Sequence, residues 1–208
     1  MTETIQSRNE ALARRVRTRL AEKGVYAVNV MGSPGSGKTG VLTGLIKTLN
    51  MPAFVIEGDI ESDIDAKKLQ ALGIGSYQIN TGGACHLDAP LIERALNENP
   101  VENCFLFIEN IGNLVCPAEF AIGEHMKLLV CSVPEGGDKP YKYPLAFEKA
   151  DAIVLNKTDL LPYVEFDYGY FEKGVRYLNK HAPVFKTSAV KGEGFDGLAD
   201  MLICRLKR

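Results

Sequence analysis

The feature that most constrains this chain is a glycine-rich segment, residues 32–39, with the sequence Gly-Ser-Pro-Gly-Ser-Gly-Lys-Thr. It has the pattern G-x-x-x-x-G-K-[ST] of a phosphate-binding loop. Residues 25–30 before it are apolar and β-branched, which predicts a buried strand, and apolar residues recur at helical spacing over residues 41–49. A strand before the loop and a helix after it form the context that phosphate binding requires.

The residue types of this loop predict how it would hold phosphate. Glycines let the backbone wrap closely around phosphate oxygens, and the start of the following helix favours negative charge. Lys38 is expected to contact the β- and γ-phosphates and to be catalytic, and the Thr39 hydroxyl is expected to bind Mg²⁺. The predicted nucleotide-binding residues of this loop are Gly35, Ser36, Gly37, Lys38, Thr39 and Gly40.

Strand-like and helix-like segments alternate along the chain, which predicts an α/β protein. We expect a three-layer P-loop NTPase fold, with a mostly parallel sheet flanked by helices on both faces. Residues 1–24 are predicted to be an N-terminal helix and residues 25–208 a single domain. Strands are expected at residues 25–30, 53–57, 76–79, 104–108, 127–133, 151–155 and 184–187, and a last helix at residues 195–206.

Composition excludes several classes of protein. The formal net charge is −2, so the chain lacks the global positive charge of a nucleic-acid-binding protein. No apolar run is long enough to cross a membrane, and the N-terminus does not resemble a signal peptide. The five cysteines are odd in number and form no C-x-x-C pair, which argues against a disulfide framework. These observations predict a cytoplasmic protein with no nucleic-acid or membrane partner.

A second nucleotide motif, Asn-Lys-Thr-Asp at residues 156–159, follows a predicted strand. This N-K-x-D pattern reads guanine, because the Asp159 carboxylate can accept two hydrogen bonds that adenine cannot donate. Residues 187–191 resemble the S-A-K element whose backbone N–H meets the guanine carbonyl. GTP is therefore the predicted nucleotide, with ATP and a simple capping turn as alternatives. The residues assigned to guanine binding are Asn156, Lys157, Asp159, Ser188, Ala189 and Val190.

Three carboxylates are candidates for Mg²⁺ binding and for positioning the attacking water: Asp59, Asp65 and Glu109. Asp59 is expected to end one strand, and Glu109 is expected to end the next core strand. No glutamine or arginine can be assigned as a catalytic finger, so slow intrinsic hydrolysis is expected.

Cys85-His86 and Cys116-Pro117 carry side chains that suit Zn²⁺ or Ni²⁺. Their spacing is not that of a zinc finger, so buried thiols and a helix-capping histidine remain alternatives. Three ligands leave a tetrahedral site incomplete, and a two-fold dimer that pools the cysteines of both chains would complete it.

Taken together, these residues resemble HypB, a SIMIBI-class P-loop GTPase family that serves nickel insertion into NiFe-hydrogenase. The resemblance extends from about residue 24 to residue 206. Its specific marks are residues 32–39, 57–59, 81–89, 109–117 and 156–159.

The resemblance implies a GTPase that dimerises on GTP binding and delivers nickel during hydrogenase maturation. Ni²⁺ or Zn²⁺ would bind at the dimer interface through Cys85, His86 and Cys116. The partners would be a nickel-delivery protein and the hydrogenase large subunit. The resemblance also implies Mg²⁺ and water chemistry at Thr39, Asp65 and Glu109 with Asp59 nearby, and Lys139 matches a family lysine that reaches the nucleotide of the partner subunit.

The chain departs from the family pattern in its N-terminal residues. Many family members carry an N-terminal cysteine motif or a histidine-rich tract, and residues 1–24 contain neither Cys nor His. This difference favours a GTP-linked transfer site over nickel storage. The alternatives are the related urease GTPase UreG, whose metal motif is Cys-Pro-His, a GTP-dependent chaperone of a cobalamin enzyme, and a generic GTPase switch with structural cysteines.

Overall fold

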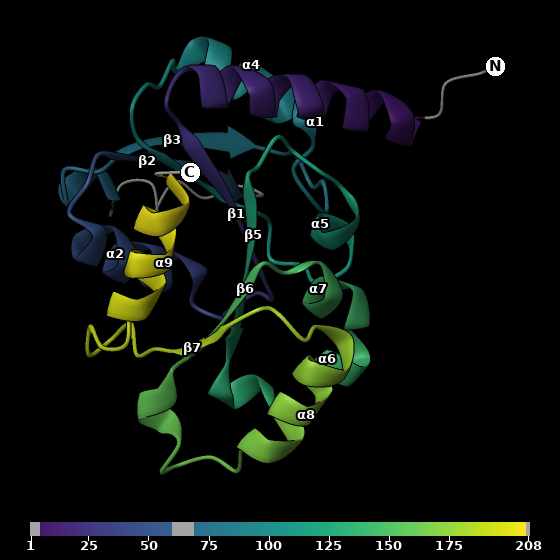
Figure 1. Cartoon of the computed structure of the whole chain (residues 1–208), viewed down its shortest axis with the longest axis vertical. Helices are drawn as coiled ribbons and strands as arrows, with labels where there is room; N and C mark the ends of the chain where they lie inside the picture. Colours follow the sequence, from purple (N-terminus) through teal and green to yellow (C-terminus); the bar gives the residue numbers. More distant parts are fainter. Residues whose placement is uncertain (1–4, 60–68, 207–208) are drawn as a thin grey trace.

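The computed structural model describes residues 5–59 and 69–206, and its seven strands form a single sheet (Figure 1). The strand order is β3-β2-β4-β1-β5-β6-β7, and every neighbouring pair is parallel. The predicted parallel α/β fold is confirmed, and each predicted strand is present with its ends displaced by at most two residues. The strands are β1 (Tyr26–Gly32), β2 (Ala53–Asp59), β3 (Gly75–Asn80), β4 (Phe105–Glu109), β5 (Met126–Ser132), β6 (Ala152–Asn156) and β7 (Val184–Lys186).

The central strands are apolar on both faces, as strand β4 illustrates. Phe105 and Phe107 pack into the core on one face of the sheet, whereas Leu106 and Ile108 pack into the core on the other. Successive side chains of a strand point to opposite faces, so both sets are buried only where helices cover both faces. The continuous apolar runs in the sequence have this physical origin.

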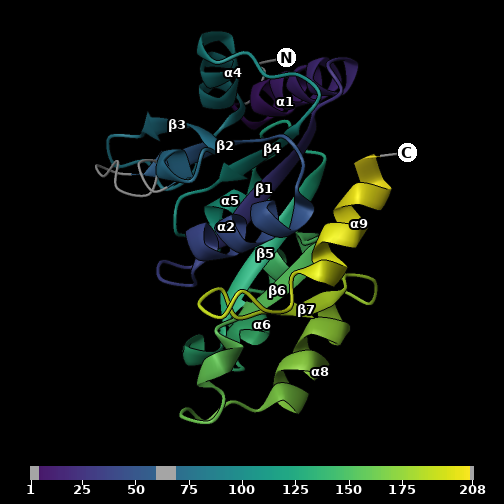
Figure 2. The same ribbon diagram turned by 90° about the vertical axis from the view of Figure 1, so that its left-hand side faces the viewer.

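Helices α2 (Lys38–Leu49) and α9 (Asp196–Leu206) cover one face of the sheet (Figures 1 and 2). The two helices pack closely at Gly44 of α2. A Cβ atom on Gly44 would lie 2.6 Å from the ring of Phe195, which directly precedes α9. The opposite face is covered by α1 (Ile5–Glu22) and α4 (Ala89–Glu98) beside β2 and β4, and by α5 (Cys116–Glu119), α7 (Pro144–Lys149) and α8 (Tyr168–Leu178) beside β5 and β6.

Several short helices were not predicted. They are α5, α7, α6 (Lys139–Lys142) and the 3-10 turns η1 (Val133–Glu135) and η2 (Thr158–Leu160). Each is too short to display helical periodicity in the sequence. The longer α8 was also not predicted, although Asp167 caps it by accepting a hydrogen bond from the Tyr170 N–H. The helix expected after Asp59 falls mostly on residues 60–68, outside the described residues.

The carboxyl ends of the parallel strands lie at one edge of the sheet, where ligands bind in such folds. Gly32 ends β1, Asp59 ends β2, Glu109 ends β4 and Asn156 ends β6. The loops of the candidate site therefore start at the same edge of the sheet, from β1, β2, β4 and β6. In the described parts of the chain, no helix combines the length and the apolar character needed to cross a membrane.

Candidate functional site

The phosphate loop joins the end of β1 at Gly32 to the start of α2 at Lys38. Gly35 and Gly37 have φ angles of 74° and 92°, in the left-handed region that favours glycine. Residues 156–159 and 187–191 are called the guanine-reading loops below. Gly37 lies so close to the first of them that a Cβ atom on Gly37 would be 2.5 Å from Asn156 Nδ2. Gly37 has no side chain to cap α2, so the first N–H groups of this helix suit an anion.

Lys38 and Thr39 occupy the first turn of α2. The Lys38 ammonium is buried and donates hydrogen bonds to the carbonyl oxygens of Gly32 and Ser33, at 3.4 and 3.3 Å. Thr39 Oγ1 donates to Glu109 Oε1 at 3.1 Å. A hydroxyl and a carboxylate at this separation are oxygen ligands of the kind that Mg²⁺ prefers.

For the other two candidate Mg²⁺ ligands, Asp59 and Asp65, the structure gives the backbone position of Asp59 alone. Asp59 is the last residue of β2, and its backbone pairs with Asn80 of β3. Asp65 lies outside the described residues. Their roles at the Mg²⁺ site stay predictions.

The guanine-reading loops are joined to the phosphate loop through Asn156. Its Nδ2 donates to the Ser36 carbonyl at 3.1 Å, and its Oδ1 accepts from Thr187 Oγ1 and from the Ala189 N–H, both at 3.2 Å. Asn156 is only 1% exposed. Asn156 therefore joins separate loops, and Thr187, which was not among the residues assigned to guanine binding, takes part in this contact.

The remaining guanine-reading residues lie close by. Asp159 Oδ1 accepts a hydrogen bond from Ser188 Oγ at 2.6 Å, which orients the carboxylate. Lys157 has a left-handed φ of 60°, and its Nζ donates to the Gly35 carbonyl at 2.6 Å. Gly40 lies against Ala189, whose Cβ would be 3.1 Å from a Cβ added there. The next residue, Val190, is largely exposed. The structure thus brings the two predicted nucleotide motifs into contact.

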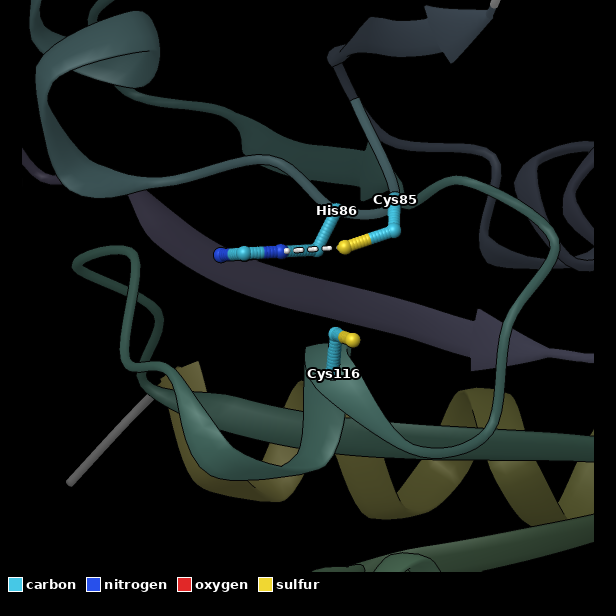
Figure 3. Close-up of side chains that lie close together, drawn as sticks. All are labelled: Cys85, His86 and Cys116. Atoms are coloured by element: carbon cyan, nitrogen blue, oxygen red, sulfur yellow. Dashed lines mark hydrogen bonds between the residues drawn. The ribbon is translucent and has the colours of Figure 1, made fainter. Parts of the chain in front are cut away.

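Cys85, His86 and Cys116 converge on one point (Figure 3). Their ligand atoms all lie within 4.8 Å of one another, and Cys85 Sγ is 3.2 Å from His86 Nδ1. Cys85 is exposed, while His86 and Cys116 are partly buried. The hydrogen bond with Cys116, aided by desolvation, raises the pKa of the Cys85 thiol. Two thiols and an imidazole at this separation form a donor set that suits Ni²⁺ or Zn²⁺.

The alternatives that spacing left open at these residues are wrong. Cys85 and Cys116 are not buried thiols, in contrast to Cys104 and Cys131, whose pKa values are raised by burial in the core. His86 does not cap α4, because Asp88 caps this helix by accepting from the Leu91 N–H.

Two side chains that the sequence did not single out support the cluster. The His86 ring stacks on Phe120, with centroids 4.3 Å apart and planes 19° apart. The Lys127 ammonium donates to the carbonyls of Pro117 and Phe120, at 3.2 and 3.1 Å, and pairs with Glu124 at 3.0 Å. Lys127 therefore holds the segment that carries Cys116 and Phe120 against β5.

Lys139 is the first residue of α6. Within this chain its ammonium lies 3.5 Å from Glu135 Oε1 and 5.2 Å from the centre of the Tyr143 ring. That Lys139 reaches the nucleotide of a partner subunit stays a prediction.

The chain is similar to known proteins in both its sequence and its fold. The family described as CobW/HypB/UreG, nucleotide-binding domain, matches residues 26–186. Hydrogenase maturation factor HypB of Azotobacter vinelandii is 46% identical over 193 residues, which cover 91% of this chain and 64% of that protein. The chain thus spans a little under two thirds of that relative. Hydrogenase/urease maturation factor HypB of Helicobacter hepaticus is 39% identical over 203 residues, covering 95% of this chain and 84% of that protein.

Two solved structures resemble the whole fold. HypB from Helicobacter pylori, in complex with nickel, has a TM-score of 0.90 at 35% identity, covering 97% of this chain and 96% of that one. HypB from Archaeoglobus fulgidus has a TM-score of 0.89 at 35% identity, covering 96% of this chain and 99% of that one. The chain therefore belongs to the CobW/HypB/UreG family of P-loop GTPases and, within it, to the HypB maturation factors.

Proposed function

We propose that this chain is a GTP-hydrolysing metallochaperone that delivers nickel during NiFe-hydrogenase maturation. One observation carries the proposal: a guanine-nucleotide site and a Cys85–His86–Cys116 cluster lie on adjoining loops at the same edge of one sheet. The Helicobacter pylori relative in complex with nickel supports the choice of metal. The names of the relatives support hydrogenase as the acceptor.

The nucleotide chemistry is hydrolysis of GTP by water to GDP and phosphate. Lys38 exchanges its hydrogen bonds to the loop carbonyls for contacts with the β- and γ-phosphates, and the loop amides hold the remaining oxygens. Thr39, with Glu109, Asp65 or Asp59 nearby, would hold Mg²⁺, and the ion would supply neutralisation of phosphate charge. Glu109 keeps the Thr39 hydroxyl in place through their hydrogen bond. Since no arginine or glutamine finger can be assigned, turnover by the isolated chain is slow.

The metal chemistry requires a second copy of the chain. Cys85, His86 and Cys116 offer three ligand atoms, fewer than a closed tetrahedral site needs. The exposure of Cys85 allows a second cluster to approach it across a two-fold axis. The pooled thiolates then bind Ni²⁺, or Zn²⁺, at the interface. Lys139 contacts the nucleotide of the partner subunit, so that GTP favours the dimer.

This arrangement links the nucleotide state to metal affinity. Any change in nickel affinity on GTP binding is matched by an equal change in GTP affinity on nickel binding. A nickel-delivery protein loads the site, hydrolysis loosens it, and the hydrogenase large subunit receives the ion. All five cysteines are free thiols, which fits a reducing cytoplasm.

The proposal is tested by nickel titration of the full chain and of two cysteine variants. Cys116→Ala removes one thiolate of the cluster, and Cys204→Ala removes an exposed thiol of α9 as the matched control. Cys116→Ala is expected to lose nickel binding, and Cys204→Ala to keep it, while both variants release phosphate from GTP. If Cys116→Ala binds nickel as the unmodified chain does, the protein is a GTPase switch with structural cysteines.

Urease is a second candidate acceptor, because the Helicobacter hepaticus relative is named a hydrogenase/urease maturation factor. Nickel transfer from the loaded protein to purified apo-hydrogenase large subunit and to apo-urease separates the two acceptors. Transfer to urease alone would replace hydrogenase in the proposal.

A further inference from the structure

The segment that runs from the last residue of β4 toward α5, residues 109–113, lies against the phosphate loop at three points. Glu109 accepts the hydrogen bond from Thr39 at its start. Gly112 lies so close to Pro34 that a Cβ atom would be 2.9 Å from the Pro34 ring and 3.0 Å from its backbone. Asn113 forms an isolated β-bridge with Gly32. A shift of the phosphate loop therefore displaces this segment.

The same segment holds the loop that carries Cys85 and His86. Asn110 Oδ1 accepts from the Leu87 N–H at 3.1 Å, directly after His86. Asn110 is 1% exposed, and its Nδ2 donates to Asn29 Oδ1 at 3.1 Å within β1. Asn110 thus fixes one end of the metal-binding loop to the sheet.

Asn113 contacts both halves of the thiol pair. Its Nδ2 donates to the Cys85 carbonyl at 3.1 Å, and its Oδ1 accepts from the Val115 N–H at 2.9 Å. Val115 directly precedes Cys116, the first residue of α5. One planar amide therefore spans the backbones that carry the two thiols, while the backbone of Asn113 pairs with Gly32 of the phosphate loop.

We propose that Asn113 is a positioning residue that converts the state of the phosphate loop into the separation of Cys85 and Cys116. This inference rests on the proposed function. A donor and an acceptor on one amide hold the two backbones at a nearly fixed distance, and metal ligation tolerates little error in ligand placement. Displacement of Gly32 on nucleotide exchange moves Asn113, and Asn113 moves the two cysteines together or apart.

The test is nickel affinity of the full chain with GDP and with a non-hydrolysable GTP analogue, compared between variants. Asn113→Ala removes both hydrogen bonds. The matched control is Asn99→Ala, because Asn99 Nδ2 also donates to a backbone carbonyl, that of Ala95, at the end of α4. Loss of a side chain that orients metal ligands typically lowers metal affinity about 10- to 100-fold. We expect a loss of this size for Asn113→Ala, unchanged affinity for the analogue without nickel, and no effect of Asn99→Ala.

The decisive quantity is the nickel dissociation constant with GDP divided by the nickel dissociation constant with the GTP analogue. Coupling between sites commonly amounts to about 5- to 150-fold. This ratio is expected to exceed one in the unmodified chain and in Asn99→Ala, and to fall to one in Asn113→Ala. A role in stability alone would lower the unfolding temperature and leave the ratio unchanged.

Asn113→Asp is a second variant that separates the two bonds. It keeps an acceptor for the Val115 N–H, but a carboxylate cannot donate to the Cys85 carbonyl. Its added charge attracts Ni²⁺, so the ratio rather than the absolute affinity is compared. The ratio is expected to fall to one here too, and this variant decides the outcome if Asn113→Ala does not fold.

Three results would overturn the proposal in distinguishable ways. A ratio of one in the unmodified chain would show that the nucleotide does not act on the cluster. A wild-type ratio in both Asn113 variants would show that the coupling takes another route. No nickel binding by the unmodified chain in any nucleotide state would remove the proposed function as well.

Discussion

Replacement of Asn156 by alanine tests whether the guanine-reading and phosphate loops act as one preformed site. Asn156 makes three hydrogen bonds, to Ser36, Thr187 and Ala189, and is almost completely buried. Each hydrogen bond contributes about 1 kcal/mol net, so we expect a loss of about 3 kcal/mol of unfolding free energy. For a chain of this length, that loss lowers the unfolding temperature by roughly 6–12 °C.

The same loss of free energy sets an upper bound on the decrease in GTP affinity. If GTP must order the loops that Asn156 no longer joins, binding loses at most the same 3 kcal/mol, or roughly 100-fold in affinity. We expect a decrease of between ten- and 100-fold, because part of the order is supplied by the Lys157 contact with Gly35. Calorimetric titration with GTP and GDP, on protein shown to be folded, measures the decrease.

Asn179→Ala is the matched control. Asn179 Nδ2 lies within hydrogen-bonding distance of the carbonyls of Phe147, Glu148 and Ala150, and its Oδ1 accepts from two N–H groups. It supports the join between α7, α8 and β7 before β7 begins, whereas the guanine-binding residues 188–190 follow the end of β7. This variant is expected to lose comparable stability and to bind GTP normally. If Asn156→Ala also binds GTP normally while losing stability, the preformed-site reasoning is refuted.

Three further predictions concern guanine, nickel and protons. Asp159→Asn replaces an acceptor by a donor, so GTP affinity should fall and xanthosine triphosphate affinity should rise, measured by displacement of a fluorescent nucleotide; retained guanine preference would contradict the assigned role. Phe120→Leu removes the ring that stacks on His86, so nickel affinity should fall about tenfold with GTP affinity unchanged. The control Phe166→Leu alters a ring contact with Phe171 and should leave nickel affinity unchanged. Equal nickel affinity in both variants would exclude a role for the stack. The hydrogen bond with Cys116 raises the pKa of Cys85, so the thiol keeps its proton to higher pH and nickel must displace this proton. Apparent nickel affinity should therefore rise with pH, and nickel binding should release protons. Calorimetry in two buffers of different ionisation enthalpy measures this release, and nickel binding without it would contradict the prediction.

Strands and nucleotide motifs could be predicted because their signals are local. Strand β4 is buried on both faces, so its residues form a continuous apolar run that ends at Glu109. The phosphate loop and the N-K-x-D motif each lie within a few residues of one strand end. Short helices such as α6 and α7 begin with a proline near their first residue and last four and six residues, too few to produce a periodic pattern.

The metal cluster could be predicted only as residue types. Cys85 follows β3 and Cys116 follows β4, and these strands are separated in the sheet by β2. Loops leaving parallel strands at the same edge can meet, but the spacing of the two cysteines in the sequence does not determine that they do. The supports from Phe120, Lys127 and Asn113 depend on side-chain contacts between loops, for which the sequence carries no periodic or motif signal.

Whether GTP assembles a dimer that binds nickel is tested by measuring the mass of the protein in solution and its bound nickel in each nucleotide state. Light scattering coupled to size exclusion, with metal analysis of the eluted peak, provides both quantities. We predict a dimer that retains one nickel shared by two chains with the non-hydrolysable GTP analogue, and dissociation with loss of nickel in GDP. A mass and a nickel content that stay the same in GDP and in the analogue would contradict it.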